Sequence, residues 1–296
     1  MIPNHRIDSC IRRKAPAVRP ELFFIPFLIF SLFIFSCASV PPGGAASMEV
    51  PAPSSVDASG WEWIAVADGI SRTFASMPGR ASYHVVRIDL SVPGLEIYMA
   101  PESSGWQKPV SVARRARELS ADAAINSVPF HAAHPLLPWS DVMPAGVVYS
   151  RGVLVAGPAD SYCAAAFFRE ADGGFRAEIF DSQAELALLS EEPELAVGGF
   201  WTILRGGQKA SFSGRKDFRS ALGTADGGRT IFLLCGKKLS FMDCADILAA
   251  LGADCAMQFD GGSSCCLFAG GSVLLRGVPS RNVAGALFFA AGGAGK

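Results

Sequence analysis

Residues 248–264 read Leu-Ala-Ala-Leu-Gly-Ala-Asp-Cys-Ala-Met-Gln-Phe-Asp-Gly-Gly-Ser-Ser, and the fold and the candidate site are both built around this stretch. Its first apolar residues have helical spacing and end at Gly252, as is typical of a helix C-terminus. An apolar strand over residues 255–259 follows, with Asp260 at its carboxyl end. Sheets covered by helices often place ligands beyond such strand ends, so Asp260 is the first candidate site residue.

The loop after Asp260 consists of small residues. Glycines let backbone N–H groups approach an anion closely, and serine hydroxyls add further donors. We therefore expect a substrate-binding cradle made of Gly261, Gly262, Ser263 and Ser264. An ordinary tight turn is the alternative, because Asp-Gly-Gly also occurs at residues 172–174 and 226–228.

The rest of the folded part is rich in short strands. Hairpins are predicted around the turns at residues 171–174 and 226–228, and a third around Pro93-Gly94, because glycine supplies positive φ. Helices are predicted at residues 111–119 and 242–251, the second capped by Ser240. Strands are predicted at residues 83–90, 95–99, 123–126, 164–169, 175–180, 220–225, 230–235, 255–259, 265–268 and 284–289.

This order of elements indicates an α+β or mixed α/β fold. Strand-dominated runs with helices between them predict one domain, with a mixed, largely antiparallel β-sheet covered by a few helices.

Composition excludes two classes of protein. Half of the 296 residues are apolar and 18% are charged, so the bulk of the chain buries a core and is not intrinsically disordered. The formal net charge of -1 gives no basic excess. Nucleic-acid binding needs a strongly basic face, so no nucleic-acid partner is expected.

The first 60 residues predict export. A basic stretch precedes an apolar run at residues 22–35, which is shorter than the roughly 20 residues of a membrane-spanning helix. We expect a signal peptide at residues 1–36, a lipidated Cys37 that begins a flexible tether ending at residue 60, and a folded domain at residues 61–296. This predicts a cell-envelope protein, lipid-anchored on a periplasmic or outer surface. An uncleaved signal anchor and secretion without lipid are the alternatives.

Six cysteines belong to the folded part, and an exported chain meets an oxidising compartment. No pair has the Cys-x-x-Cys spacing of a zinc site, and most lie in apolar runs, where cysteine packs as a small hydrophobe. Buried thiols and one or more disulfides both stay open for Cys163, Cys235, Cys244, Cys255, Cys265 and Cys266.

Four segments resemble motifs of the phosphodiester glycosidase family, which includes the enzyme that removes N-acetylglucosamine from mannose-6-phosphate tags. Residues 258–264 resemble its asparagine-leucine-aspartate-glycine-glycine-glycine-serine-serine motif, and residues 219–223 its arginine-threonine-alanine-isoleucine-glycine strand. Residues 198–200 are similar to its glycine-glycine segment before a strand. Residues 281–287 resemble its closing arginine-x-valine-alanine-asparagine-alanine-leucine. The resemblance runs in consistent order over residues 83–290.

The chain also departs from these motifs. Asn126 is present, but Ser127 and Val128 replace the two glycines that follow it in the family. Gln258 and Gly285 stand where the family has asparagine, and one glycine of the aspartate motif is missing. Substrate contacts are expected to differ at these positions.

The resemblance implies hydrolysis of a sugar phosphodiester at the anomeric carbon, with Asp260, Arg219 and Asn126 as catalytic residues. It implies that Asp260 acts as base, nucleophile or oxocarbenium stabiliser, that Arg219 binds the phosphodiester bidentately, and that Asn126 fixes a sugar hydroxyl or phosphate oxygen. Phosphate leaves with little proton assistance, so no second carboxylate is named. We expect the three side chains to converge on one cleft. Without the resemblance, Arg219 reads equally as a surface strand residue and Asn126 as a turn residue.

His131 and Arg281 complete the expected substrate-binding set, although Arg281 reads equally as a strand end. His131, His134 and Asp141 are close in sequence, but the prolines between them make this segment a loop. Hydrogen bonding or substrate contact is therefore expected there rather than metal ligation, and no cofactor is expected.

The leading functional prediction is a phosphodiester glycosidase acting on cell-envelope or extracellular glycans, with a glycan or sugar phosphate as partner. The alternatives are a non-catalytic glycan-binding or structural lipoprotein of the same fold, and a phosphodiesterase that attacks phosphorus. Trp106 and Trp139 lie in predicted loops, where each either stacks on a sugar ring or forms part of the core.

Overall fold

The computed structural model describes residues 60–134, 137, 139–159, 161–212 and 214–292, all within one unit that begins at residue 53. The predicted signal peptide, Cys37 and the tether up to residue 59 lie outside the described residues. Within the described ranges, no helix is long and apolar enough to cross a bilayer.

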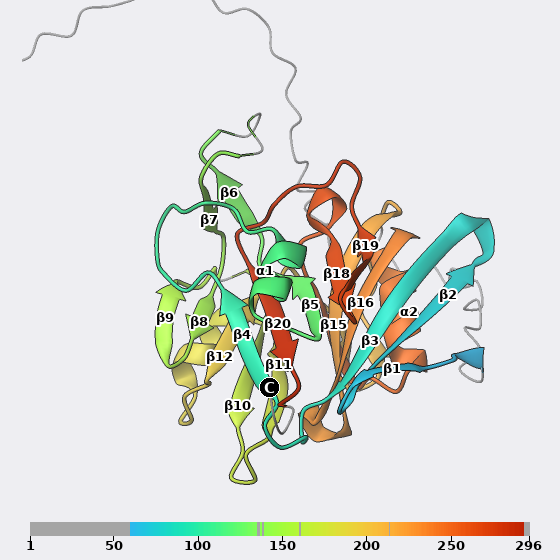
Figure 1. Cartoon of the computed structure of the whole chain (residues 1–296), viewed down its shortest axis with the longest axis horizontal. Coiled ribbons are helices and arrows are strands. Elements are labelled where there is room, and N and C mark those ends of the chain that lie inside the picture. Colours follow the sequence, from blue (N-terminus) through green and yellow to red (C-terminus); the bar gives the residue numbers. More distant parts are fainter. Residues whose placement is uncertain (1–59, 135–136, 138, 160, 213, 293–296) are drawn as a thin grey trace, which may run out of the picture. The chain divides into compact units, whose positions relative to one another are not determined.

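The largest sheet has eight strands in the order β1-β2-β3-β16-β15-β17-β13-β14 (Figure 1). They are β1 (Ile64–Ala67), β2 (Ile70–Met77), β3 (Ala81–Asp89), β16 (Thr230–Leu239), β15 (Asp217–Ala225), β17 (Cys255–Gln258), β13 (Thr202–Arg205) and β14 (Gln208–Lys209).

Two five-stranded sheets and one short hairpin complete the β structure. The first sheet contains β11 (Phe175–Phe180), β10 (Ala164–Arg169), β12 (Leu195–Gly198), β8 (Val148–Ser150) and β9 (Val153–Ala156). The second contains β19 (Ser272–Arg276), β18 (Cys266–Ala269), β5 (Ala123–Asn126), β20 (Ala286–Ala290) and β4 (Glu96–Ala100). The hairpin pairs β6 (Phe130–Ala132) with β7 (Val142–Pro144).

Every pair of strands in the described part is antiparallel, so the expectation of a mixed sheet is wrong. The structure is mostly antiparallel β with few helices. Two predicted hairpins are confirmed, β10–β11 and β15–β16. The third is wrong: β3 pairs with β2 and β16, so both its edges are occupied and β4 pairs with β20 instead.

Both predicted helices are confirmed: α1 (Val112–Glu118) and α2 (Phe241–Ala250). A capping box begins α2, because Ser240 Oγ accepts from the Asp243 N–H and the Asp243 carboxylate accepts from the Ser240 N–H. Short 3₁₀ turns occur at η2 (Pro78–Arg80), η3 (Gln183–Leu188), η4 (Asp226–Gly228) and η5 (Gly262–Ser264).

The main core lies where the three larger sheets meet. It contains Leu222 and Leu233 of the eight-stranded sheet, Phe167 of β10 and Ile125 and Leu287 of the sheet around β20, all fully buried. A second core packs α2 against the opposite face of the eight-stranded sheet, and a third packs α1 against β18 and β5. Because side chains alternate between faces along a strand, β15, β16 and β17 contribute to two cores at once.

The six described cysteines are free thiols, so the structure selects the first of the two possibilities left open by the sequence. Burial raises the pKa of the Cys163 and Cys244 thiols to about 12 and that of Cys266 to about 11. These side chains are therefore protonated near neutral pH and are not nucleophiles.

Gly199 shows how closely the strand ends approach each other. It lies between β12 and β13, and a Cβ atom there would overlap the backbone oxygen of Gln258 and the Met257 side chain. The Gly-Gly segment singled out in the sequence therefore serves packing at this position.

We expect Gly199→Ala to lower the free energy of unfolding by about 1–3 kcal/mol, because the clash involves backbone that has to shift. Gly157→Ala is the matched control, since nothing lies within 4 Å of a Cβ atom there. Chemical denaturation of both variants tests this, and equal stability of the two would contradict it.

Candidate functional site

The ends of three neighbouring strands of the eight-stranded sheet, β15, β17 and β13, bring candidate residues together at one end of that sheet. Antiparallel pairing places the start of β15 beside the end of β17, with Ala221 opposite Gln258 and the Phe259 N–H bonded to the Ser220 carbonyl. On the other side of β17, the Gln258 N–H donates to the Trp201 carbonyl at 2.9 Å. Asp260 therefore follows directly from the middle strand of three.

The Asp260 carboxyl is largely buried and lies beside a cation. One oxygen accepts the Gly261 N–H at 3.0 Å, and the other lies 3.5 Å from Arg281 Nη2. The side chain is only 14% exposed. Burial raises the pKa of this carboxyl above its usual range, although hydrogen bonding from Ser264 and the charge of Arg281 oppose the rise.

Asn126 holds this aspartate through its backbone. Its Nδ2 donates to the Asp260 carbonyl at 2.7 Å, and its Oδ1 accepts from Ser220 Oγ at 2.8 Å and from the Cys266 N–H at 2.9 Å. The side chain is fully buried, and these bonds engage both of its polar atoms. Asn126 is thus a positioning residue in this structure, and the expected contact with a sugar hydroxyl or phosphate oxygen is not available to it.

Ser220 belongs to the same buried network and was missed by sequence reasoning. Its Oγ also lies 3.0 Å from Cys235 Sγ and 3.1 Å from Cys265 Sγ. A hydroxyl directly before the apolar Ala221 and Leu222 was the available signal, because buried polar groups need partners.

The structure does not bring the Arg219 guanidinium to the Asp260 carboxylate. Nε and Nη2 donate to the carbonyls of Leu239 and Arg215 at 3.3 and 2.6 Å, and the guanidinium lies 4.1 Å from the centre of the Phe241 ring. The predicted convergence of three side chains is therefore wrong in this respect, and Nε and Nη2 are not free for a bidentate phosphodiester contact. The physical reason is that α2 begins beside this strand end and offers the guanidinium an aromatic face.

Arg281 is the cation of the site. Nε donates to Ser264 Oγ at 2.9 Å, and the guanidinium lies 4.4 Å from the centre of the Phe130 ring. It also lines a cavity of about 250 Å³ that contains a second arginine. The cavity is lined by Ser111, Val112, Ala113, Cys265, Cys266, Val273, Arg276, Ser280, Arg281 and Asn282. Asp260 thus lies next to a pocket suited to an anion.

The remaining predicted residues lie around this point. Gly261, Gly262 and Ser263 are half-buried, Ser264 is buried, and His131 is exposed on β6 beside Phe130. His134 is exposed, and Asp141 pairs with Lys108 at 2.7 Å. No group of three or more metal-ligating side chains occurs among the described residues. Trp106 and Trp139 are 50% and 68% exposed, so neither belongs to the core.

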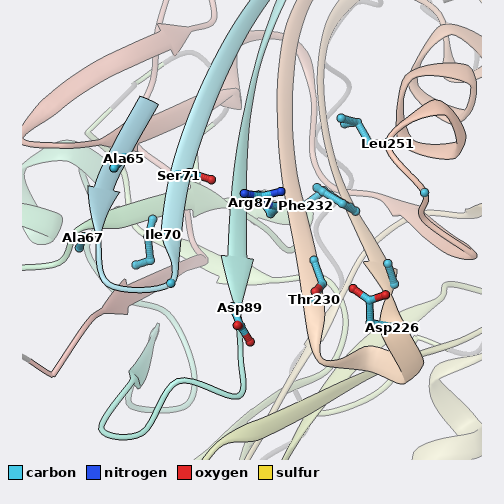
Figure 2. A pocket seen from close by; sticks show the side chains of 13 residues that line it. Ala65, Ala67, Ile70, Ser71, Arg87, Asp89, Asp226, Thr230, Phe232 and Leu251 are labelled. Atoms are coloured by element: carbon cyan, nitrogen blue, oxygen red, sulfur yellow. The ribbon is translucent and has the colours of Figure 1, made fainter. Parts of the chain in front are cut away.

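A larger cavity, of about 560 Å³, lies at the other end of the same strands (Figure 2). Arg87, Asp89, Asp226 and Thr230 are among the residues that line it. None of the predicted site residues lines it. Because β15 rises about 3.3 Å per residue, Ala225 at its wall is roughly 20 Å along the strand from Arg219.

Two of the departures from the family motifs compensate each other. A Cβ atom on Gly285 would overlap Val128 Cγ1 and lie 3.0 Å from Ser127 Oγ. The chain therefore has valine at position 128, where the family motif has glycine. It has glycine at position 285, where the family motif has asparagine. The exchange keeps the volume filled, and Asn126 keeps its contact with Asp260.

The candidate site thus combines a buried carboxyl, an arginine beside it and a cavity that contains a second arginine, on an antiparallel β scaffold. The family model of phosphodiester glycosidases matches residues 120–290. The chain belongs to this family, which is one of hydrolase-type enzymes. Among curated proteins, none matches the chain significantly.

Solved structures share the fold. A hypothetical protein from Synechocystis superposes with a TM-score of 0.57 and 18% identity over 77% of this chain. The zebrafish N-acetylglucosamine-1-phosphodiester alpha-N-acetylglucosaminidase catalytic domain, auto-inhibited by its pro-peptide, gives 0.56 and 17% identity over 78% of this chain and 81% of its own. The chain spans 63% of the Synechocystis protein.

We expect Asp260→Asn to stabilise the protein at neutral pH. The raised pKa means that folding disfavours the charged form, so the wild type carries a penalty above the folded-state pKa that disappears below the ordinary aspartate value of 3.8. Thermal unfolding from neutral to acidic pH should show the gain shrinking as the pH falls. If Asp260→Asn gives no gain in stability at neutral pH, or a gain that grows in acid, the pKa of Asp260 is not raised in the folded protein.

The exchange between Val128 and Gly285 predicts coupled substitutions. Gly285→Ala alone should cost about 1–3 kcal/mol of stability through overpacking, and Val128→Ala should cost less when combined with it than alone. A double-mutant cycle measured by denaturation tests this, and additive effects would show that the two positions are independent.

Proposed function

We propose that this protein hydrolyses the bond between an anomeric carbon and the phosphate oxygen of a sugar phosphodiester. The observation that carries the proposal is the buried Asp260 carboxyl beside Arg281, which lines a cavity that also contains Arg276. Family membership supports the same reaction class.

In this proposal Arg281 and Arg276 bind the phosphodiester, which is a monoanion. Their guanidinium groups stabilise the charge that grows on the leaving phosphate. Asp260 in its ionised form takes a proton from the attacking water, and a raised pKa makes it a stronger base. Water adds to the anomeric carbon, the carbon–oxygen bond to phosphate breaks, and a reducing sugar and a phosphomonoester leave. The other half of the site is structural, since Asn126 fixes the Asp260 backbone.

We place this activity in the cell envelope, on glycans. The apolar run at residues 22–35 and Cys37 support export and lipid anchoring. The family supports a glycan substrate.

A non-catalytic glycan-binding protein is the second candidate. The replacement of the family's glycines by Ser127 and Val128 favours it. The compensating Gly285 weighs against it, because the Asn126 contact with Asp260 survives the change.

The test is release of reducing sugar from methyl phosphodiesters of glucose, galactose, mannose and N-acetylglucosamine. We expect Asp260→Asn to lower kcat/KM by about 10²-fold or more, and Arg281→Ala by about 10²–10³-fold. Arg87 lines the other cavity, so Arg87→Ala is the control for the loss of an arginine outside the candidate site. In ¹⁸O-labelled water the label should enter the sugar. Label in the phosphate would instead show attack at phosphorus, and undiminished turnover by Asp260→Asn would remove this residue from the mechanism.

The pH profile is a separate prediction. If Asp260 is the base, kcat/KM should fall in acid with a midpoint above the ordinary value of 3.8, because burial raises its pKa. Rates measured from pH 3 to about pH 8 check this. A profile without an acid limb in that range would contradict the role of Asp260 as base.

A further inference from the structure

Four aromatic side chains form a cluster at the same end of the eight-stranded sheet as Asp260: Phe200, Trp201, Phe212 and Phe241. The Trp201 ring centre lies 5.1 Å from that of Phe200, 5.4 Å from Phe241 and 6.1 Å from Phe212. Although its ring contacts all three, Trp201 is 40% exposed. The indole is thus packed on some sides and open to solvent on others.

The packing holds the indole in one orientation. Phe200 stacks on it at an interplanar angle of 25°, and Phe241 meets it edge-on at 64°. Phe241 is the first residue of α2 and lies under the Arg219 guanidinium. An exposed aromatic fixed in this way loses little conformational entropy when a ligand stacks on it.

The sheet register places the cluster next to the reacting group. The Trp201 carbonyl accepts the N–H of Gln258, two residues before Asp260, and Arg219 is the third residue of β15, the strand on the other side of β17. Neighbouring strands are about 4.8 Å apart, so the three strand ends span roughly 10 Å. Arg219 Nη1, which makes no hydrogen bond within the described part, lies 3.7 Å from where a Cβ of Gly261 would be. The cluster and the Asp260 loop are therefore connected through one cation.

We propose that Trp201 is a stacking platform for a pyranose ring of the substrate, at a subsite beside the one that holds the reacting sugar. The apolar face of a pyranose ring fits a flat indole, while a neighbouring cation such as Arg219 serves its hydroxyl groups. The preferred substrate is then a phosphodiester with a second sugar ring, which the methyl phosphodiesters of single sugars lack. The proposal rests on the proposed function only in taking Asp260 as the reacting end.

The surroundings of Trp201 favour a sugar over an apolar partner. Around the Trp201 indole the structure has three half-buried rings, one of which, Phe241, carries the Arg219 guanidinium, rather than a wide exposed apolar patch. Protein and membrane contacts use broader apolar surfaces than one ring. One ring with a polar neighbour matches the size of one sugar.

Isothermal titration calorimetry of the full chain with neutral hexasaccharides tests the subsite without any hydrolysis. The probes are cellohexaose, chitohexaose and maltohexaose. We expect the wild type to bind at least one of them and Trp201→Ala to bind it about tenfold more weakly. Trp201→Phe should keep most of the affinity. Phe74→Ala removes a more exposed aromatic from β2 and should leave affinity unchanged.

Two results would overturn the subsite: no hexasaccharide bound by the wild type, or equal affinity of the wild type and a folded Trp201→Ala. If Trp201→Ala does not fold, Trp201→Leu takes its place, and equal affinity of Trp201→Leu and the wild type decides against stacking. Asp260→Asn separates the two proposals. If Asp260→Asn binds the hexasaccharide as the wild type does but no longer hydrolyses phosphodiesters, both proposals are supported. If Asp260→Asn hydrolyses phosphodiesters as fast as the wild type, only the proposed function is overturned.

Discussion

The hydrogen bond from Asn126 Nδ2 to the Asp260 carbonyl joins the two parts of the molecule that make the site. Asn126 ends β5 in one sheet, and Asp260 follows β17 in another. The same amide accepts a bond from Ser220 on β15, so three strands from two sheets meet at one buried side chain. A bond of this kind is costly to lose because it would leave a buried amide unpaired. The position of the carboxyl therefore depends on the registration of the two sheets.

The site buries the Asp260 carboxyl at a cost in free energy, and neighbouring groups offset only part of that cost. Burial disfavours the charged form of Asp260, and Arg281, Ser264 and the Gly261 N–H oppose that effect without cancelling it. Structural ion pairs are usually arranged to stabilise the charge, whereas functional groups often keep a perturbed pKa. The arginine in this role comes from the segment between β19 and β20 and not from β15. This arrangement leaves Arg219 for the aromatic cluster on the α2 side of the sheet.

Local sequence signals predicted much of the fold because local chemistry determined it. Ser240 and Gly252 bound α2, and the turns at residues 171–174 and 226–228 produced the expected hairpins. The error at residues 83–99 arose because pairing partners of β3 come from elsewhere in the chain, and no local signal reports that its edges are already filled. Asp260 was found from its place after a strand. The pairing of Arg281 rather than Arg219 depends on where α2 begins in space, which the sequence spacing does not contain.

The strand order places β20, close to the end of the described chain, between β5 and β4 (Figure 1). Both neighbours precede it by more than a hundred residues, since β5 ends at Asn126 and β20 begins at Ala286. During synthesis, β4 and β5 cannot pair with β20 until residues 286–290 have been made, and Asn126 meets Ser220, Asp260 and Cys266 only after those residues have been made. Contacts of such long range form slowly. The sheet that holds Asn126 is therefore completed late in folding.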